Sequence, residues 1–485
     1  MPVDSTSSYY DELAEGWEMV DDLQSEKKIK DAGTTYVPQL TGQSSDEYDA
    51  YLLRGSLFGA FVRTVKGLSG AILRKPPEAD VPKSVENMFP DMTLDGKNFS
   101  EVIRKIVTED LKYGYYGVLI DPPLEGGDPK LALYDAKSIL QPVTERVGGK
   151  IRATMITLCE NVNVPKADDK YTTEEVRRVR ELRIGDDGFY EQVLYEEVGG
   201  AWQEIGLVKP EFMGKRPTEI PFIFFGSSEN SVIPKEGPLL DLAYLNVKHF
   251  VITVDFFHAL HFCGLPTPWA AGFSLKDGES LHIGSATAWV SEDAQANCGM
   301  LQLDGSGVGA IETALDKLEK QMAVVGSRMI EQQRRGVETA EGLLIRQTSD
   351  FAVLSNIAAC VEDGMEKVLT WMAIAVGASE AEIAKIKVRL NKDYTTADVN
   401  PQVLTALFVA LQNNTISLES FLYYLKQKEV LPSHRTIQQE KELISSGENM
   451  ELVEKMFGSV KTEDVTDNRL KGASGVITNG QDELK

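Results

Sequence analysis

Cysteine is scarce in this sequence, and its spacing excludes two classes of protein. Only four cysteines occur in 485 residues, and no two of them form a CxxC pair. A disulfide-stapled secreted scaffold and a cysteine-based zinc site both need more closely grouped cysteines. The sequence therefore predicts free, mostly buried thiols in a reducing compartment, at Cys159, Cys263, Cys298 and Cys360.

Long hydrophobic runs are also missing. The longest apolar stretch, residues 247–262, is interrupted by Lys248, Asp255 and several histidines. A membrane-spanning helix needs about 20 predominantly apolar residues, and charged residues inside it are costly. The first 22 residues are acidic and show no basic region followed by an apolar core. We therefore expect neither a membrane span nor a secretory signal peptide.

Positive charge is in short supply. The chain carries 74 acidic and 50 basic residues, for a net charge of -24. A protein that grips double-stranded DNA gains affinity by neutralising phosphates with lysine and arginine. The composition therefore argues against tight or sequence-specific nucleic-acid binding, and favours a surface that repels DNA or never meets it.

Catalytic signatures are absent as well. The sequence contains no phosphate-binding GxxxxGK[ST] loop, no HExxH, no EF-hand loop and no GxSxG elbow. The Gly-rich stretch 305–309 lacks the lysine of a phosphate loop and is interpreted as a loop before a helix. His258 and His261 share a helix face near Cys263, but packed or hydrogen-bonded histidines are favoured over a metal site. We expect no catalytic residue, no metal and no cofactor.

What the sequence does contain is typical of a folded protein with two or more packed units. Apolar residues make up 42% and charged residues 26% of the chain. After an acidic start with one amphipathic segment near 10–23, residues 45–75 predict a helix with Ser45 as its N-cap. A second helix is expected at 99–112. From 115 to 225 the period-two pattern predicts strands, with hairpin turns at 185–188 and 199–200.

Three long helices follow. The first, residues 238–262, is apolar on nearly every side, and its charges at Asp241, Lys248 and Asp255 form one narrow stripe. Such a helix must be buried on most sides, and neighbouring subunits are one source of that burial. Short strands are expected at 280–284, 287–291 and 299–305. The second helix, 308–333, carries a heptad seam of apolar residues, namely Ile311, Leu315, Leu318, Met322, Val325 and Met329.

The third long helix is predicted at 339–376, again with heptad spacing, and short helices follow to the end of the chain. On the second helix, Glu312, Asp316 and Glu319 lie on one side. Two interpretations stay open for them: a solvated face with partners such as Lys320, or an acidic stripe that faces a channel. The chain between the second and third helices holds glycines that can interrupt a helix.

The order of these parts resembles that of the portal, or head-to-tail connector, proteins of tailed bacteriophages. Three phrases carry the resemblance: AYLLRGSLFGAFVRTVKGLSGAILRKPP, YLNVKHFVITVDFFHALHFCGLPTPWAAG and NNTISLESFLYYLKQKEVLP. The resemblance covers about residues 45–445 and implies a portal-like α+β fold. In order, it implies an acidic N-terminal segment (1–44), a wing of helices and antiparallel sheet (45–237), a first stem helix (238–262), a small β clip (263–307), a second stem helix (308–333), a tunnel loop (334–342), a long kinked wing helix with a strand (343–395), a helical crown (396–458) and a flexible tail (459–485).

The resemblance also implies a function. A ring of about twelve copies would stand at the capsid vertex of the virion, after assembly in the host cytoplasm. It would conduct double-stranded DNA during packaging and ejection, without sequence specificity, and would contact the capsid protein, the terminase motor and neck or tail adaptor proteins. The ring itself would not be an enzyme. In the tunnel loop, the residues expected near DNA are Arg334, Arg335, Glu338 and Glu341. The alternatives are another structural subunit of a large assembly, such as a capsid or neck protein, or an enzyme whose site escapes recognition.

Overall fold

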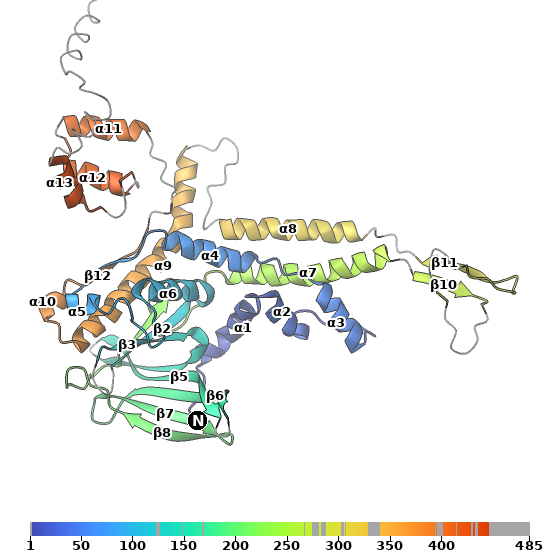
Figure 1. The fold of residues 1–485 in the computed structure, drawn as a ribbon, viewed down its shortest axis with the longest axis horizontal. Helices are drawn as coiled ribbons and strands as arrows, with labels where there is room; N and C mark the ends of the chain where they lie inside the picture. The colour runs from blue at the N-terminus through green and yellow to red at the C-terminus, as the bar shows by residue number, and fades with distance from the viewer. Residues whose placement is uncertain are drawn as a thin grey trace, which may run out of the picture. The chain divides into compact units, whose positions relative to one another are not determined.

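The computed structural model divides into two compact units, Met1–Tyr394 and Thr395–Lys485, which are described separately. It describes residues 2–122, 127–147, 149–166, 169–265, 267–273, 281–282, 288–301, 305, 307–327, 340–392, 394, 401–413, 415–427, 430–431 and 435–445. Both helices and sheets contribute, so the mixed helix and sheet class expected from the sequence is confirmed (Figure 1). Within the described residues no helix is long and apolar enough to cross a membrane.

The acidic N-terminal segment is folded against the core of the first unit. It forms α1 (Ser8–Asp22), α2 (Glu26–Asp31) and the short 3-10 helix η1 (Gly33–Thr35). Helix α1 covers the amphipathic stretch expected from the sequence, and its buried residues include Trp17 and Val20. The indole of Trp17 donates a hydrogen bond to the carbonyl of Tyr113, 3.2 Å away. This contact fixes α1 to the end of a helix almost 100 residues later.

The single helix expected at 45–75 is wrong: the structure has two. Helix α3 (Ser45–Arg54) begins with Ser44 as N-cap, in a capping box with Glu47, rather than with Ser45. Helix α4 (Ala60–Ile72) follows after a break. At Gly55 a Cβ atom would lie 2.4 Å from the side chain of Val254, so this backbone passes directly over another helix. Tertiary contacts therefore override local helix propensity here.

A three-stranded antiparallel sheet forms the centre of the first unit. Its order is β3 (Lys130–Asp135), β2 (Tyr115–Asp121), β9 (Phe222–Gly226). The central strand β2 thus pairs with the next strand of the chain on one side and with the distant β9 on the other. Helix α6 (Phe99–Tyr113) leads into β2. Its expected N-terminus is confirmed by the capping box of Asn98 and Glu101, and Gly114 ends it in the left-handed conformation.

A second sheet of five antiparallel strands follows the chain order: β4 (Ile139–Val147), β5 (Lys150–Lys166), β6 (Asp169–Ile184), β7 (Tyr190–Val198) and β8 (Ala201–Val208). The expected two-residue turn at Gly199-Gly200 is confirmed, and both glycines have positive φ. Arg180 joins the two sheets, since it pairs with Glu160 on β5 at 2.8 Å and with Asp121 on β2 at 3.1 Å.

Helix α9 (Ala340–Ala375) packs on the central sheet and on α6. Its heptad positions from Leu354 to Met372 are fully buried, as expected. A Cβ atom at Gly364 would lie 2.3 Å from the ring of Phe225, so the helix approaches β9 as closely as a glycine allows. Around this core lie α5 (Lys83–Glu86), the 3-10 helix η2 (Ala136–Ser138), α10 (Glu380–Ile383) and the pair β1 (Glu78–Asp80) with β12 (Lys387–Arg389).

Two more helices, α7 (Leu240–Gly264) and α8 (Val308–Ser327), flank a hairpin of β10 (Thr267–Ala271) and β11 (Asn297–Leu301). Helix α7 begins after Pro238 and includes Cys263, which the sequence placed beyond its end. Strand β10 was not predicted, and the described residues of the strand expected at 287–291 are not extended in a ladder. The four cysteines are free, but none is fully buried, and Cys298 on β11 is exposed.

The second unit contains three short helices in its described part, α11 (Pro401–Gln412), α12 (Leu418–Gln427) and α13 (Ile437–Ser445). Helix α12 contacts both of the others, and Leu422 is buried among them. The tail expected to be flexible, 459–485, lies outside the described residues.

One acidic side chain is enclosed in the core of the first unit. Asp110 on α6 is 0% exposed, and neither of its carboxylate oxygens has a hydrogen-bond partner among the described residues. Burial raises the pKa of Asp110 from 3.8 to about 8. The neighbouring thiol of Cys360 on α9 has its pKa raised to about 11, by burial first and by Asp110 second. Asp110 is therefore protonated in the folded protein at neutral pH.

Replacement of Asp110 by asparagine should stabilise the protein, and more so as the pH rises. The folded-state pKa is above the unfolded one, so the stability is complete below about pH 4 and falls by about 1.4 kcal/mol per pH unit up to about pH 8. Asparagine cannot ionise and removes that loss. Urea denaturation at pH 5 and pH 8 should show a larger gain at pH 8. The exposed Asp31→Asn is the control, and an equal gain at both pH values would contradict the assignment.

Candidate functional site

Helices α7 and α8 form the part of the molecule on which the sequence placed most of its candidate residues. They lie side by side (Figure 1). The Nε2 atom of His249 on α7 is 3.4 Å from Oε1 of Glu319 on α8. Further along α7, the Sγ atom of Cys263 lies 3.6 Å from the position of a Cβ at Gly305, just before α8. The contact near the end of α7 is therefore made at the start of α8, and the contact earlier in α7 is made further along α8. The two helices thus run antiparallel.

The heptad seam of α8 faces into this pair. Leu315, Leu318 and Met322 are 8%, 6% and 2% exposed, while Ile311 and Val325 are half-buried. Met329, the last residue of the expected seam, lies outside the described residues. Helix α8 also contacts α4, where a Cβ at Gly326 would lie 2.9 Å from the hydroxyl oxygen of Thr64. The seam therefore attaches α8 to the body of the unit.

On α7, two polar side chains opposite the charged stripe, Asn246 and Thr253, contact the break between α3 and α4. The amide of Asn246, which is fully buried, accepts from the backbone N–H of Phe61 at 3.0 Å and donates to the carbonyl of Phe58 at 2.8 Å. The hydroxyl of Thr253 donates to the carbonyl of Ser56 and accepts from its N–H. Nearer the helix end, the hydroxyl of Tyr51 donates to Asp255.

These residues were not among the candidates drawn from the sequence. The signal was present as the spacing of Asn246, His249 and Thr253, which places three polar groups on one face of a helix that is otherwise apolar. Asn246 and Thr253 bond backbone groups of Ser56, Phe58 and Phe61 at the break, whereas His249 faces Glu319. Because the sequence predicted no break at residues 55–59, it offered no partner for them.

His249 is buried between the two helices, with the ring of Phe58 5.4 Å away. Burial lowers the pKa of His249, and Glu319 opposes this by favouring the charged imidazolium. The histidine is therefore neutral at pH 7. All three acidic residues on α8 are exposed, but only Glu319 reaches a residue of α7; Glu312 and Asp316 make no ion pair with any described residue.

The outer side of α7 and the hairpin beyond it leave large apolar groups uncovered. Asp241, Lys248 and Asp255 are exposed, as the predicted polar stripe requires. The apolar sides of α7 are not all buried, however: Tyr244 is 53% and Phe262 47% exposed. Other exposed apolar side chains in this region are Phe257, Leu260, Leu265, Trp269, Met300 and Leu301. A soluble monomer rarely exposes so many large apolar groups in one region.

Some of the expected positions cannot be placed. Arg334, Arg335 and Glu338 of the expected tunnel loop lie outside the described residues. Helix α9 begins at Ala340, so Glu341 falls in its first turn, but its side chain is not described. No group of three histidine, cysteine or acidic side chains with metal-binding geometry occurs among the described residues.

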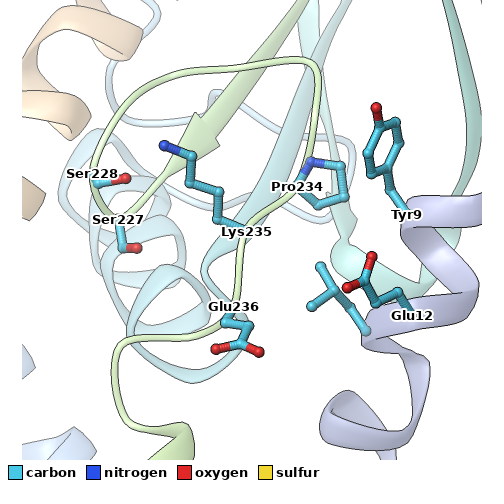
Figure 2. Close-up of a pocket in the computed structure, with 8 residues that line it drawn as sticks. Tyr9, Glu12, Ser227, Ser228, Pro234, Lys235 and Glu236 are labelled. Carbon is cyan, nitrogen blue, oxygen red and sulfur yellow. The ribbon is translucent and has the colours of Figure 1, made fainter.

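A cleft of about 480 Å³ opens elsewhere, between α1 and the loop after β9 (Figure 2). Tyr9 and Glu12 line one side, and Ser227, Ser228 and Lys235 the other. Lys235 forms an ion pair with Glu229 at 2.7 Å. The cleft is open and holds neither a nucleophile–base pair nor a buried titratable group, so it lacks the arrangement of a catalytic site.

Comparison with known proteins gives one family and several structures. Residues 238–374 match a family described as a domain of unknown function, DUF4055. No curated protein matches the chain. The neck of an empty gene transfer agent particle is 12% identical, over 81% of this chain and 97% of that one, with a TM-score of 0.38. The native gene transfer agent virion gives 12% identity, 82% and 98% coverage and a TM-score of 0.37. An HK97-family phage portal protein from Corynebacterium diphtheriae gives 10% identity, 72% and 95% coverage and a TM-score of 0.30. The matching structures thus include the class of protein that the sequence resembles.

The contacts of Asn246 should make it essential for stability. Asn246→Leu leaves the buried N–H of Phe61 without a partner, at about 1–3 kcal/mol, whereas the carbonyl of Phe58 still accepts from the N–H of Ala60. We expect the free energy of unfolding to fall by roughly 1–3 kcal/mol in urea denaturation. The control is Lys248→Leu on the exposed side of the same helix, which should change it by less than about 1 kcal/mol. Equal effects of the two substitutions would show that the amide contacts do not hold α7.

Proposed function

We propose that this chain is the subunit of a bacteriophage-type portal, a ring through which double-stranded DNA enters and leaves a capsid. The observation that carries the proposal is the pair of helices α7 and α8, called the arm below. The rest of the chain covers only the inner side of this arm. Exposed Tyr244, Phe262 and Leu265 need further burial, and identical neighbours in a ring would supply it. In the portal family such paired helices form the stem of the ring.

The order of the elements supports the same proposal. The acidic N-terminal segment would hold α1 and α2, and the wing would be the two sheets with α3–α6 and α9. The stem would be α7 and α8, the clip the β10–β11 hairpin, and the crown α11–α13. The net charge of -24 suits a ring in which DNA slides without being held. The ring would stand at the capsid vertex, receive the terminase motor during packaging and neck or tail proteins afterwards, and have no enzymatic activity of its own.

Electron microscopy of the purified protein tests the proposal most directly. We expect closed rings of about twelve copies with a central hole, and light scattering should give one large species at micromolar concentration. The contacts would be head-to-tail, because one side of the arm must meet a different side of the next. A stable, well-folded monomer at micromolar concentration would overturn the proposal.

The buried seam offers a second test. Leu318 is 6% exposed, so Leu318→Asp places an unpaired carboxylate between α7 and α8, at a cost of several kcal/mol. We expect the variant to lose rings while its far-UV circular dichroism spectrum stays close to that of the natural protein and its unfolding in urea stays cooperative. Leu318→Met, which keeps the volume, and Leu94→Asp, at an 83% exposed position, should both form rings. Normal rings from Leu318→Asp would exclude the seam from the assembly.

A further inference from the structure

His249 on α7 is a titratable side chain that lies beside the apolar seam of α8. Its side chain is 5% exposed. The seam residues Leu315, Leu318 and Met322 are buried in the same contact between the two helices. Neither ring nitrogen of His249 makes a hydrogen bond with a described residue. Because a buried polar group without partners is costly, its presence in this contact calls for an explanation.

A carboxylate and an aromatic ring face the imidazole of His249. The Oε1 atom of Glu319 on α8 lies 3.4 Å from Nε2, which is longer than a normal hydrogen bond. Glu319 is 48% exposed, so water screens its attraction for a charge on the imidazole. From the break between α3 and α4, the ring of Phe58 lies 5.4 Å away, and the guanidinium of Arg63 is 5.8 Å from that ring. On α7 itself, the adjacent Lys248 is exposed.

These surroundings suit a neutral imidazole better than a charged one. Neutral imidazole has one N–H donor, whereas imidazolium has two. Glu319 can accept from one of them, but the other finds no acceptor among the described residues. A proton would also place a charge in a nearly enclosed side chain. Burial therefore lowers the pKa of His249, and Glu319 opposes this effect only in part.

The direction of this shift fixes how the contact depends on pH. The pKa of His249 in the folded protein lies below its ordinary value of 6.5, which applies once α8 has moved away and the ring has reached water. The separated state therefore binds the proton more strongly. The stability of the α7–α8 contact is complete above about pH 6.5 and falls as the pH drops below that value.

We propose that His249 makes the contact between α7 and α8 acid-sensitive, so that α8 is held on α7 at neutral pH and loosens when His249 takes up a proton. The contacts of α9 with β9 and with α6 include no part of either arm helix, so acid should not weaken them. All of the groups involved belong to one chain. The inference therefore holds for a single subunit and does not rest on the proposed ring.

Hydrogen exchange followed by mass spectrometry measures the loosening where it occurs. The purified protein is labelled at pH 7.5 and at pH 5.5, with labelling times corrected for the pH dependence of exchange in an unfolded chain. We expect the protection of peptides from α8 to fall by roughly threefold to tenfold at pH 5.5, because local opening becomes easier there. Peptides from the buried part of α9 should lose no protection.

Two variants remove the titrating group. His249→Phe places an apolar ring beside Phe58, and His249→Gln keeps a neutral polar side chain, so a packing defect in one is checked by the other. We expect the acid-induced loss of protection in α8 to disappear in both. The matched control is His261→Gln, which removes an exposed histidine from the same helix and should keep the full loss.

The results would decide the inference in either direction. Equal or higher protection of α8 at pH 5.5 would overturn it, since the imidazolium would then hold Glu319 instead of loosening the pair. A loss that persists in both His249 variants would overturn it as well, because another group would be titrating. Neither result bears on ring formation, which electron microscopy measures at neutral pH, so this inference and the proposed function can fail separately.

Discussion

The side-chain amide of Asn246 holds together parts of the chain on which the rest of the arm depends. It accepts from the N–H of Phe61 and donates to the carbonyl of Phe58 at the break before α4, and the first of these bonds spans 185 residues of the chain. Thr253 repeats the arrangement two turns later. A helix as apolar as α7 has little in its composition to select one face for the core. These hydrogen bonds select it, because the opposite orientation would bury backbone groups without partners.

Once that face is fixed, the remaining surface of α7 follows. The inner side meets α3 and α4, α8 covers a second side, and the outer side keeps Asp241 and Lys248 in water beside Tyr244 and Phe262. Hydrogen bonds thus set the orientation, while the uncovered apolar area supplies a driving force for association at about 25 cal/mol per Å². The two effects act on opposite faces of one helix, so stability and assembly can be altered separately.

Much of the fold could be predicted because it depends on residues close together in the sequence. Examples are the capping residue Asn98, the Gly199-Gly200 turn and the heptad spacing of α9. The break between α3 and α4 could not, since its cause is Val254 and Asn246 on another helix. For the candidate site, spacing predicted the polar stripe and the buried seam of α8. Spacing could not predict that Glu319 contacts α7 while Glu312 and Asp316 do not, because this contact depends on which residue of α7 lies opposite each of them.

The net charge sets a further condition on any ring made from this chain. Copies that each carry -24 repel one another, and the repulsion grows as they approach. Burial of the apolar groups along α7 must outweigh this repulsion. The hydrophobic effect is not directional, however, so it does not favour one alignment of neighbouring copies over another. That distinction must come from directional contacts between polar or charged groups, which bring like charges together when the register is wrong.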